Sequence, residues 1–297
     1  MSREAALRDH VRSLEVLDDA VLAMKSLSAH HFRIARDALL AARVYREELA
    51  AAVASLAEAG FEVTSGPPRL VVIGADLGLC GQYHTRLVDA AVAAASALGT
   101  ESVVCIGRRT ASLLARAGVR SEVVYGAPTS VDNVVHVLLD VVSELILGTR
   151  TGRYGSIDAV FARFEGVGVF EPVQDRLLPL ARLKGGGPPA SPYVTASHLR
   201  EVALRERFYV HLEERLLDAM ASEHGMRLVA TNSAGEWLDR ELERAGHAMR
   251  ALRQESATQE ILELVAGARH RRAEAMRRKD AAAIKVRTAR TSPPADG

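Results

Sequence analysis

The fold of this chain is decided by Ser197–Lys279, which reads SHLREVALRERFYVHLEERLLDAMASEHGMRLVATNSAGEWLDRELERAGHAMRALRQESATQEILELVAGARHRRAEAMRRK. The stretch contains no proline, and its apolar residues recur in steps of three and four, which places them on one stripe of a helix. These residues are Val202, Phe208, Tyr209, Leu212, Leu216, Met220, Met226, Val229, Trp237, Leu242, Met249, Leu252, Ile261, Leu262 and Val265. At about 1.5 Å per residue, such a helix would exceed about 100 Å and would need a partner along its apolar seam.

The expected partner lies at the other end of the chain. Between Arg3 and Ala59 there is neither proline nor glycine, and apolar residues from Leu7 to Leu56 follow the same steps of three and four. We therefore predict an α/β protein with a long antiparallel coiled coil. Its two helices would be the N-terminal residues 1–60 and the C-terminal residues 197–268.

Between these helices the pattern becomes strand-like. Short apolar, β-branched runs occur at residues 69–73, 103–106, 122–125 and 157–161, and a fifth, interrupted by proline, at 167–178. Helical patterns separate them at residues 82–98, 108–117 and 131–147. Strands that alternate with helices predict a mostly parallel sheet with crossover helices on its faces. We expect a Rossmann-like domain at 68–183, inserted between the terminal helices.

Three other segments complete the expected organisation. Ser65–Pro68 is a stop and turn, and residues 184–196 begin KGGGPP, which is typical of a flexible linker. Ser197 after this linker is the expected N-cap of the long helix. Residues 269–297 form a basic extension that ends near Pro293-Pro294. Unpaired arginines are costly to bury in apolar surroundings. We therefore expect this extension not to be enclosed by an apolar surface of any partner.

Composition limits the possible functions. The net charge of +1 gives no global argument for nucleic acid or an anionic membrane. No apolar run is long enough to cross a bilayer, and the charged start MSREAALRDH is unlike a signal peptide. Cys80 and Cys105 lack metal or redox spacing, so we expect reduced, packed thiols.

The sequence holds no recognisable catalytic constellation. The motifs HExxH, GxSxG and GxxxxGK[ST] are all absent from it. The loop after the first expected strand carries Gly74, Gly78 and Gly81, whose spacing is not GxGxxG, so we interpret them as turn glycines. His30 and His31 are adjacent and point to different helix faces, which argues against a shared metal. We predict no catalytic, cofactor-binding or metal-binding residue.

Four stretches together resemble a known family, the gamma subunit or central rotor shaft of F-type ATP synthases. AMKSLSA at 23–29 is similar to the family's AMKMVAAS, and DLGLCG at 76–81 to its DRGLCG. ASE at 221–223, followed by RLVA at 227–230, is similar to ASE…ARMVAM. Gln254 and SATQEI at 256–261, with Val265, are similar to RQxxITQEIxEIV. The resemblance extends to about Ala268.

The resemblance implies a function and a set of partners. The chain would be a non-catalytic shaft that turns inside the α3β3 ring and couples ion flow to ATP synthesis or hydrolysis. Its partners would be the alpha and beta subunits, the epsilon subunit and the membrane c-ring, without nucleic acid, cofactor or direct membrane insertion. Its place would be peripheral, at the cytoplasmic face of the bacterial plasma membrane.

The resemblance also implies roles for particular residues. Moving beta-subunit segments would engage the shaft at Met24, Lys25, Arg227, Gln254 and Thr258. The end of the long helix would turn in the apolar bearing of the ring. The bearing residues would be Leu262 and Val265.

Departures from the family pattern keep more than one function possible. Leu77 stands where the family has arginine, and TNSAGEWL at 231–238 replaces the run MKAATDNA. Asp18 and Asp19 lie where the family is usually basic or polar. These changes favour a divergent, alternative bacterial F-type ATPase beside the housekeeping synthase. A coiled-coil adaptor without rotary function and a nucleotide-binding α/β enzyme are the two competing hypotheses.

Overall fold

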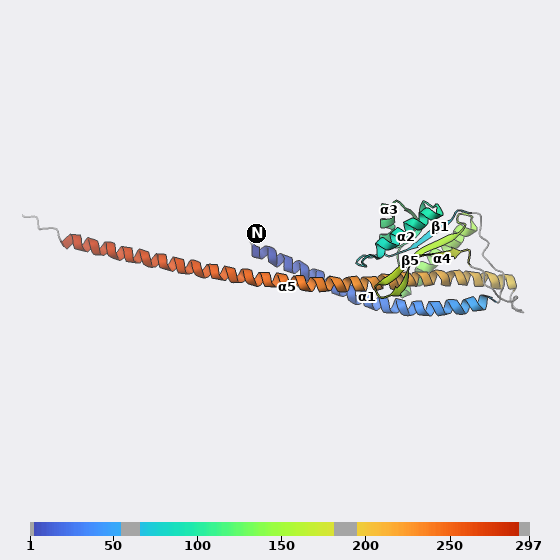
Figure 1. Cartoon of the computed structure of the whole chain (residues 1–297), viewed down its shortest axis with the longest axis horizontal. Helices are drawn as coiled ribbons and strands as arrows, with labels where there is room; N and C mark the ends of the chain where they lie inside the picture. Colours follow the sequence, from blue (N-terminus) through green and yellow to red (C-terminus); the bar gives the residue numbers. More distant parts are fainter. Residues whose placement is uncertain (1–2, 55–65, 181–194, 291–297) are drawn as a thin grey trace, which may run out of the picture. The chain divides into compact units, whose positions relative to one another are not determined.

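The computed structural model describes residues 3–54, 66–180 and 195–290 (Figure 1). Its elements are α1 (Arg3–Ala54), β1 (Arg69–Ile73), α2 (Tyr83–Leu98), β2 (Ser102–Ile106), α3 (Arg108–Arg116), β3 (Arg120–Tyr125), a 3-10 turn (Val131–Asn133), α4 (Val134–Arg150), β4 (Ile157–Gly166), β5 (Val169–Leu178) and α5 (Ala196–Arg290). The expected linker up to residue 194, Ser65 of the expected turn, and the end of the basic extension from residue 291 lie outside the described residues.

The chain divides into two compact units. One comprises Asp19–Glu236, and the other comprises Met1–Asp18 together with Trp237–Gly297. Helices α1 and α5 each contribute residues to both units. The sheet and its covering helices belong to the first unit.

The sheet confirms the prediction of a mostly parallel α/β domain. Its five strands lie in the order β3-β2-β1-β4-β5, and only the β4–β5 pair is antiparallel. The proline-interrupted fifth run is a strand, with Pro172 paired opposite Ala162 at the sheet edge. Strand β4 continues to Gly166, beyond the predicted run, because a hairpin with β5 satisfies its backbone there.

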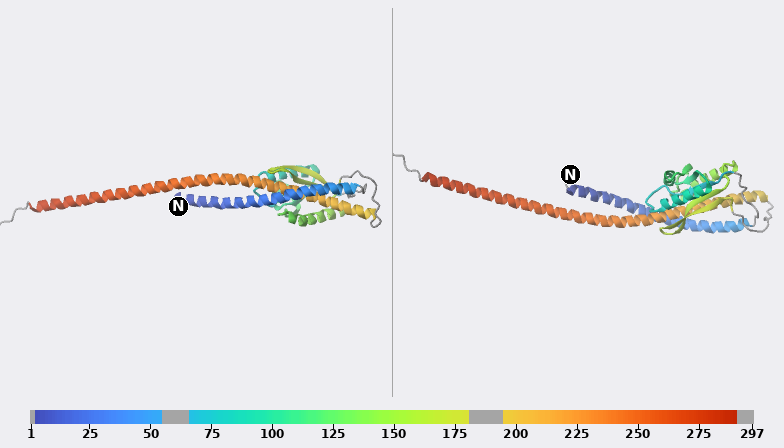
Figure 2. Two further views of the ribbon diagram at one scale, coloured as in Figure 1. Left: turned by 90° about the horizontal axis from the view of Figure 1, so that it is seen from below. Right: turned by 45° about the horizontal axis from the view of Figure 1, so that its top comes forward.

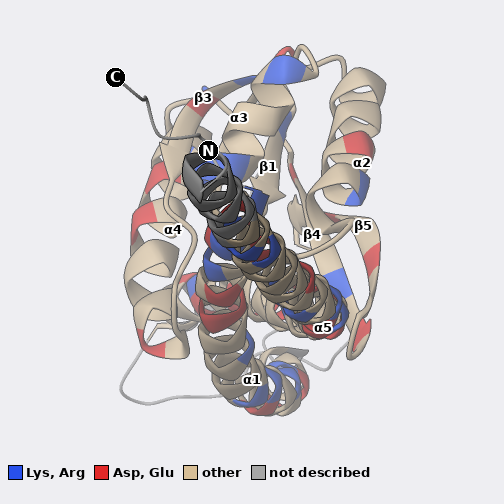
Figure 3. Ribbon diagram, turned by 90° about the vertical axis from the view of Figure 1, so that its left-hand side faces the viewer, with Lys and Arg blue, Asp and Glu red and all other residues tan. Residues whose placement is uncertain are grey.

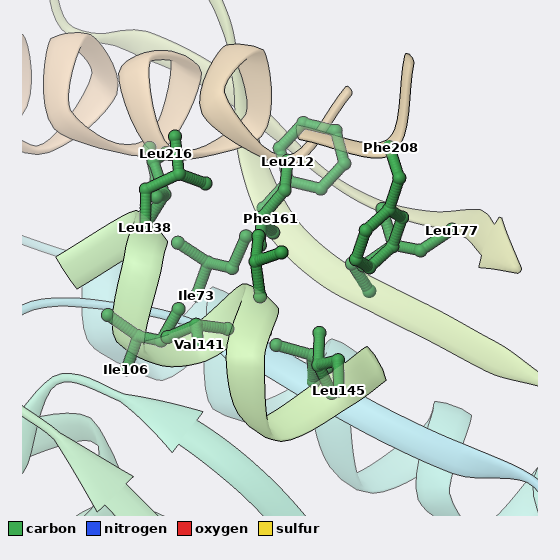
Figure 4. Packing of buried hydrophobic residues seen from close by; sticks show 14 of the residues in the cluster. Ile73, Ile106, Leu138, Val141, Leu145, Phe161, Leu177, Phe208, Leu212 and Leu216 are labelled. Carbon is green, nitrogen blue, oxygen red and sulfur yellow. The ribbon is translucent and has the colours of Figure 1, made fainter. Parts of the chain in front are cut away.

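Alternate residues of the central strands supply two cores, one on each face of the sheet. Leu70 and Val72 of β1 pack with α2 and α3, and Val71 and Ile73 pack with α4 and both long helices. Figure 4 shows the second core, in which side chains of α5 meet those of α4 and the sheet. The buried residues of α5 in this core include Phe208, Leu212 and Leu216.

Charged side chains join α1 to α5 within the unit Asp19–Glu236. Arg43 Nη2 donates to Asp218 Oδ1 over 2.9 Å, and Arg46 Nε lies 3.0 Å from Glu214 Oε2. Asp218 Oδ1 also accepts from the backbone N–H of Phe164 in β4, at 3.2 Å. One carboxylate therefore holds α1, α5 and the sheet together.

The two helices run in opposite directions along these contacts. In order along α1, the paired residues are His31 with His224, Arg43 with Asp218, Arg46 with Glu214, and Val53 with Ala203. In the other unit, Glu4 Oε1 lies 3.9 Å from Arg253 Nε, so an early residue of α1 again meets a late residue of α5. Figure 2 shows the α1 and α5 segments beside the sheet in both views.

The start of α5 differs from the expectation. The helix begins at Ala196, so Ser197 lies inside it, and the predicted N-cap at Ser197 is wrong. The cap is Thr195, whose Oγ1 accepts from the His198 N–H at 3.4 Å. At its other end α5 continues to Arg290, consistent with the helix preference of alanine and arginine in the basic extension.

The packing of α5 on the sheet leads to a stability prediction. Phe208→Ala should lower the free energy of unfolding by about 3–5 kcal/mol, because the ring is fully buried and its removal leaves a cavity. Urea titration followed by circular dichroism measures this change. Val202→Ala, at a 45% exposed position of the same helix, is the matched control and should cost no more than about 0.5 kcal/mol. Equal effects of the two substitutions would contradict the assigned packing.

Candidate functional site

The most organised polar site of the described chain centres on Arg227, which is 2% exposed in α5. Its Nε donates to the carbonyl oxygen of Gly78 at 3.0 Å, and its Nη2 donates to that of Leu77 at 3.3 Å. Nη2 also forms an ion pair with Glu223, one turn earlier on the helix. Arg227 therefore fastens the loop of residues 76–81 to α5.

The same loop is anchored at its start by Asp76. Asp76 Oδ1 accepts from the backbone N–H groups of Arg108 at 2.7 Å and Ala127 at 3.1 Å, and Oδ2 accepts from Arg108 Nε at 3.0 Å. Leu79 has a φ of 58°, a left-handed conformation that costs energy for a leucine. Leu77 and Leu79 expose 52% and 55% of their surface. A rigidly held loop thus presents two leucines to its surroundings.

Histidines surround the buried guanidinium. The rings of His31 and His224 stack with centroids 5.2 Å apart, and His224 Nδ1 lies 3.3 Å from Arg227 Nη1. Burial, and then the charge of Arg227, lower the pKa of His224 to about 3. Burial is also the main cause of the lowered pKa of His31 and of His84. Neutral rings next to a guanidinium avoid like-charge repulsion at neutral pH.

Burial also governs the pKa values of Glu223 and of the two cysteines. It raises the pKa of Glu223 even though Arg227 opposes the shift. Both cysteines are free and buried, and burial raises the pKa to about 11 for Cys80 and about 12 for Cys105. Since the thiolate is the reactive form, these thiols are inert packing residues. The expectation that both cysteines are packed is confirmed.

The residues that were expected to engage partners belong to two different compact units. Met24 and Lys25 are half-buried on α1, in the same unit as Arg227. Arg227 is not a surface residue, because internal carbonyls and Glu223 occupy its donors. The structure therefore buries the guanidinium that was expected to engage a moving beta-subunit segment. Gln254 and Thr258 belong to the other unit.

In that other unit the expected residues lie on the surface of α5. Thr258 Oγ1 donates to the carbonyl oxygen of Gln254, one turn earlier, at 2.8 Å. Leu262 and Val265 are 60% and 43% exposed, and Ile261 is 61% exposed beside them. This part of α5 thus carries an uncovered apolar band after a polar turn.

Sequence reasoning missed the residues that hold the loop. Asp76 and Glu223 lie inside two of the motifs that carry the family resemblance, yet their role depends on contacts between segments far apart in the chain. Ser28 of the first motif is also buried, at 2% exposure. The signal available in the sequence was that each of these two motifs contains an acidic residue without a defined role.

Among the described residues, no three histidine, cysteine or acidic side chains come together as a group that could hold a metal ion. Among the described helices, none has the length and apolar character needed to cross a bilayer.

Comparison with known proteins gives consistent results. A family model described as ATP synthase matches residues 4–270. The chain is 26% identical over 284 residues to the ATP synthase gamma chain of Pelotomaculum thermopropionicum, covering 88% of this chain and 96% of that one. It is 27% identical over 294 residues to that of Caulobacter sp. (strain K31), covering 88% and 97%.

Solved structures share the fold. A chain from the cryo-EM structure of the Euglena gracilis mitochondrial ATP synthase, comprising OSCP, F1 and c-ring, matches with a TM-score of 0.61 at 11% identity, covering 99% of this chain and 98% of that chain. A chain from the central stalk and c-ring of the Tetrahymena thermophila enzyme matches with a TM-score of 0.52 at 16% identity, covering 72% and 99%.

The anchoring role of Arg227 predicts a change in cysteine accessibility. Arg227→Gln should free the loop and leave Glu223 buried without its partner, at a cost of about 3 kcal/mol. Alkylation of Cys80 should then accelerate by about tenfold or more, because local opening exposes the thiol. Mass spectrometry after timed alkylation measures both cysteines. Cys105 in β2 is the internal control, and equal acceleration at both would indicate global unfolding instead.

Proposed function

Because this chain belongs to the ATP synthase gamma-chain family, we propose that it is the central shaft of an F-type ATPase, turning inside an α3β3 ring. The observation that carries this proposal is the uncovered apolar band of α5, where Ile261, Leu262 and Val265 are exposed. Such a band is unfavourable in water and needs a sleeve. Apolar contacts are non-directional, so a shaft can turn in an apolar bearing without a strongly preferred angle.

Turning the shaft can act on the ring because the shaft is asymmetric. Each catalytic pair would meet a different face of α1 and α5, and its conformational equilibrium would shift with the contacts it makes. The antiparallel contacts from His31–His224 to Val53–Ala203 support a coiled coil as the stiff element. We expect no chemistry on the shaft itself, which would be a non-catalytic part of the complex.

The proposed contacts with beta subunits involve two different segments. Gln254 and Thr258 would meet the ring in the turns before the apolar band, with their polar groups exposed. Met24 and Lys25 would meet it through the half-buried surface of α1. Arg227 would act indirectly, by holding the loop that presents Leu77 and Leu79.

The roles proposed for the remaining parts come from the family resemblance. The sheet domain, residues 68–183, would hold the foot of the shaft against the epsilon subunit and the c-ring. The complex would then lie peripherally at the cytoplasmic face of a bacterial plasma membrane, moving protons or sodium ions. Residues 269–297, beyond most of the family match, would pass out of the bearing because Arg269, Arg271 and Arg272 are exposed there.

Reconstitution tests the proposed function. The purified chain should hydrolyse no ATP, whereas adding it to alpha and beta subunits from the same organism should give sustained turnover. A coupled assay of ADP release measures this, with the alpha and beta subunits alone and the chain alone as controls. Two results would overturn the shaft assignment. One is ATP hydrolysis that persists in the highly purified chain, and the other is equal ATP turnover by the alpha and beta subunits with and without the chain.

The polar turn before the bearing gives a second prediction for this assembly. Gln254→Leu with Thr258→Leu should lower ATP turnover by roughly 30-fold, because two hydrogen bonds to the ring worth about 1 kcal/mol each would be lost. Ser256→Leu, also exposed but on the opposite side of the same helix, is the matched control. Normal ATP turnover of the double variant would show that Gln254 and Thr258 make no contact with the ring that matters for turnover.

A further inference from the structure

A surface groove lies on the unit Asp19–Glu236 and has no role in the shaft described above. It encloses about 340 Å³ between α1, the start of α4 and α5. Its lining includes Ala41 and Tyr45 of α1, Val135 of α4, and Glu213 and Leu217 of α5. Small residues on α1 leave space that large side chains of a partner can fill.

The apolar character of the groove extends onto its rims. Ile34 and Tyr45 on α1 are 42% and 46% exposed, and Val135 and Leu139 on α4 are 45% and 51% exposed. The spacing of each pair places it on one side of its helix, toward the groove. Large apolar side chains on both rims are typical of a surface that another helix covers.

A carboxylate without a cation lies within this apolar lining. Glu213 is half-buried and makes no hydrogen bond or ion pair to any described residue. Burial, and then the nearby Glu206, raise the pKa of Glu213. Its neighbour Glu214 differs completely, since Arg43, Arg46 and Arg215 all contact it. These three arginines are thus engaged elsewhere.

The surroundings of Glu213 add further negative charge. Glu206 accepts a hydrogen bond from the Tyr45 hydroxyl at 3.1 Å and has no cationic partner among the described residues. On the other wall of the groove, the lining residues Val131, Val134 and Val135 are uncharged. Figure 3 shows acidic residues elsewhere along α4.

We propose that this groove binds a basic amphipathic helix of another subunit, with apolar side chains between Ala41 and Val135 and a lysine or arginine at Glu213 and Glu206. The proposal rests on the shaft function only in requiring that other subunits are present. A neutral apolar segment would bury Glu213 more deeply without a cation, which is strongly unfavourable. A basic segment instead forms charge-assisted contacts with both carboxylates.

Site-specific cross-linking identifies what occupies the groove. Ala41→Cys is exposed and is coupled to a benzophenone maleimide on the purified chain, while the buried Cys80 and Cys105 stay unlabelled. The labelled chain is assembled with the other subunits and irradiated, and mass spectrometry locates the cross-link. We expect a helical segment of one other subunit with lysine or arginine three or four residues from apolar positions. Glu47→Cys, exposed on another side of α1, is the control.

Three results of the cross-linking would overturn the proposal. They are no cross-link above the Glu47→Cys level, a cross-link to a segment without lysine or arginine, and a cross-link to a second copy of this chain. If the labelled chain still supports ATP turnover in any of these cases, the shaft function stands and only the groove assignment falls. If the unlabelled chain supports no turnover, the shaft function itself fails.

Charge reversal tests the electrostatic part. Glu213→Lys should weaken binding of the identified subunit at least about tenfold, and changing the contacting lysine or arginine to glutamate should restore it. Glu47→Lys makes the same charge change outside the groove and should leave binding unchanged. Circular dichroism confirms that Glu213→Lys is folded, and Ala41→Trp, which fills the groove from an exposed position, gives an independent loss of binding. Unchanged binding by Glu213→Lys would overturn the proposal.

Discussion

The arrangement of the main unit depends on one buried carboxylate, Asp218. Its Oδ1 accepts from Arg43 of α1 and from the backbone of Phe164 in β4, while its own backbone belongs to α5. Burial raises the pKa of Asp218, and the bond from Phe164 and the charge of Arg43 oppose this shift. A buried ion pair adds little net stability, but losing one partner costs about 3–5 kcal/mol. The pair therefore fixes the register between the two helices and the sheet more than it strengthens them.

The sequence was sufficient to predict the helices and strands. It was insufficient to predict the contacts between segments that lie far apart in the chain. Apolar β-branched runs located all five strands, since burial on both faces leaves a continuous pattern in β1 and β2. The extra length of β4 and the cap at Thr195 were missed because a hairpin partner and a single hydroxyl decide them. The burial of Arg227 was missed for the same reason, because its acceptors lie in a loop far away in the chain.

Helix α5 is buried in one part of its length and exposed in another, and the two parts are suited to different roles. Between Ala203 and Arg227 most of its residues are buried against α1 and the sheet. From Gln254 to Val265 every side chain is exposed, including the large apolar ones. A segment packed on several sides cannot adapt to a partner without disturbing its own core. The exposed segment carries no such constraint, which supports the proposal that it contacts a surrounding ring.

The same reasoning bears on the role proposed for Arg227. Contact with an acidic partner would require the guanidinium to leave the carbonyls of Leu77 and Gly78 and the carboxylate of Glu223. Glu223 would then remain buried without a cation, and a partner carboxylate would have to offset that loss before adding any affinity. Holding the loop in place incurs no such cost. These contacts are the reason that we propose an internal, loop-holding role for the buried arginine.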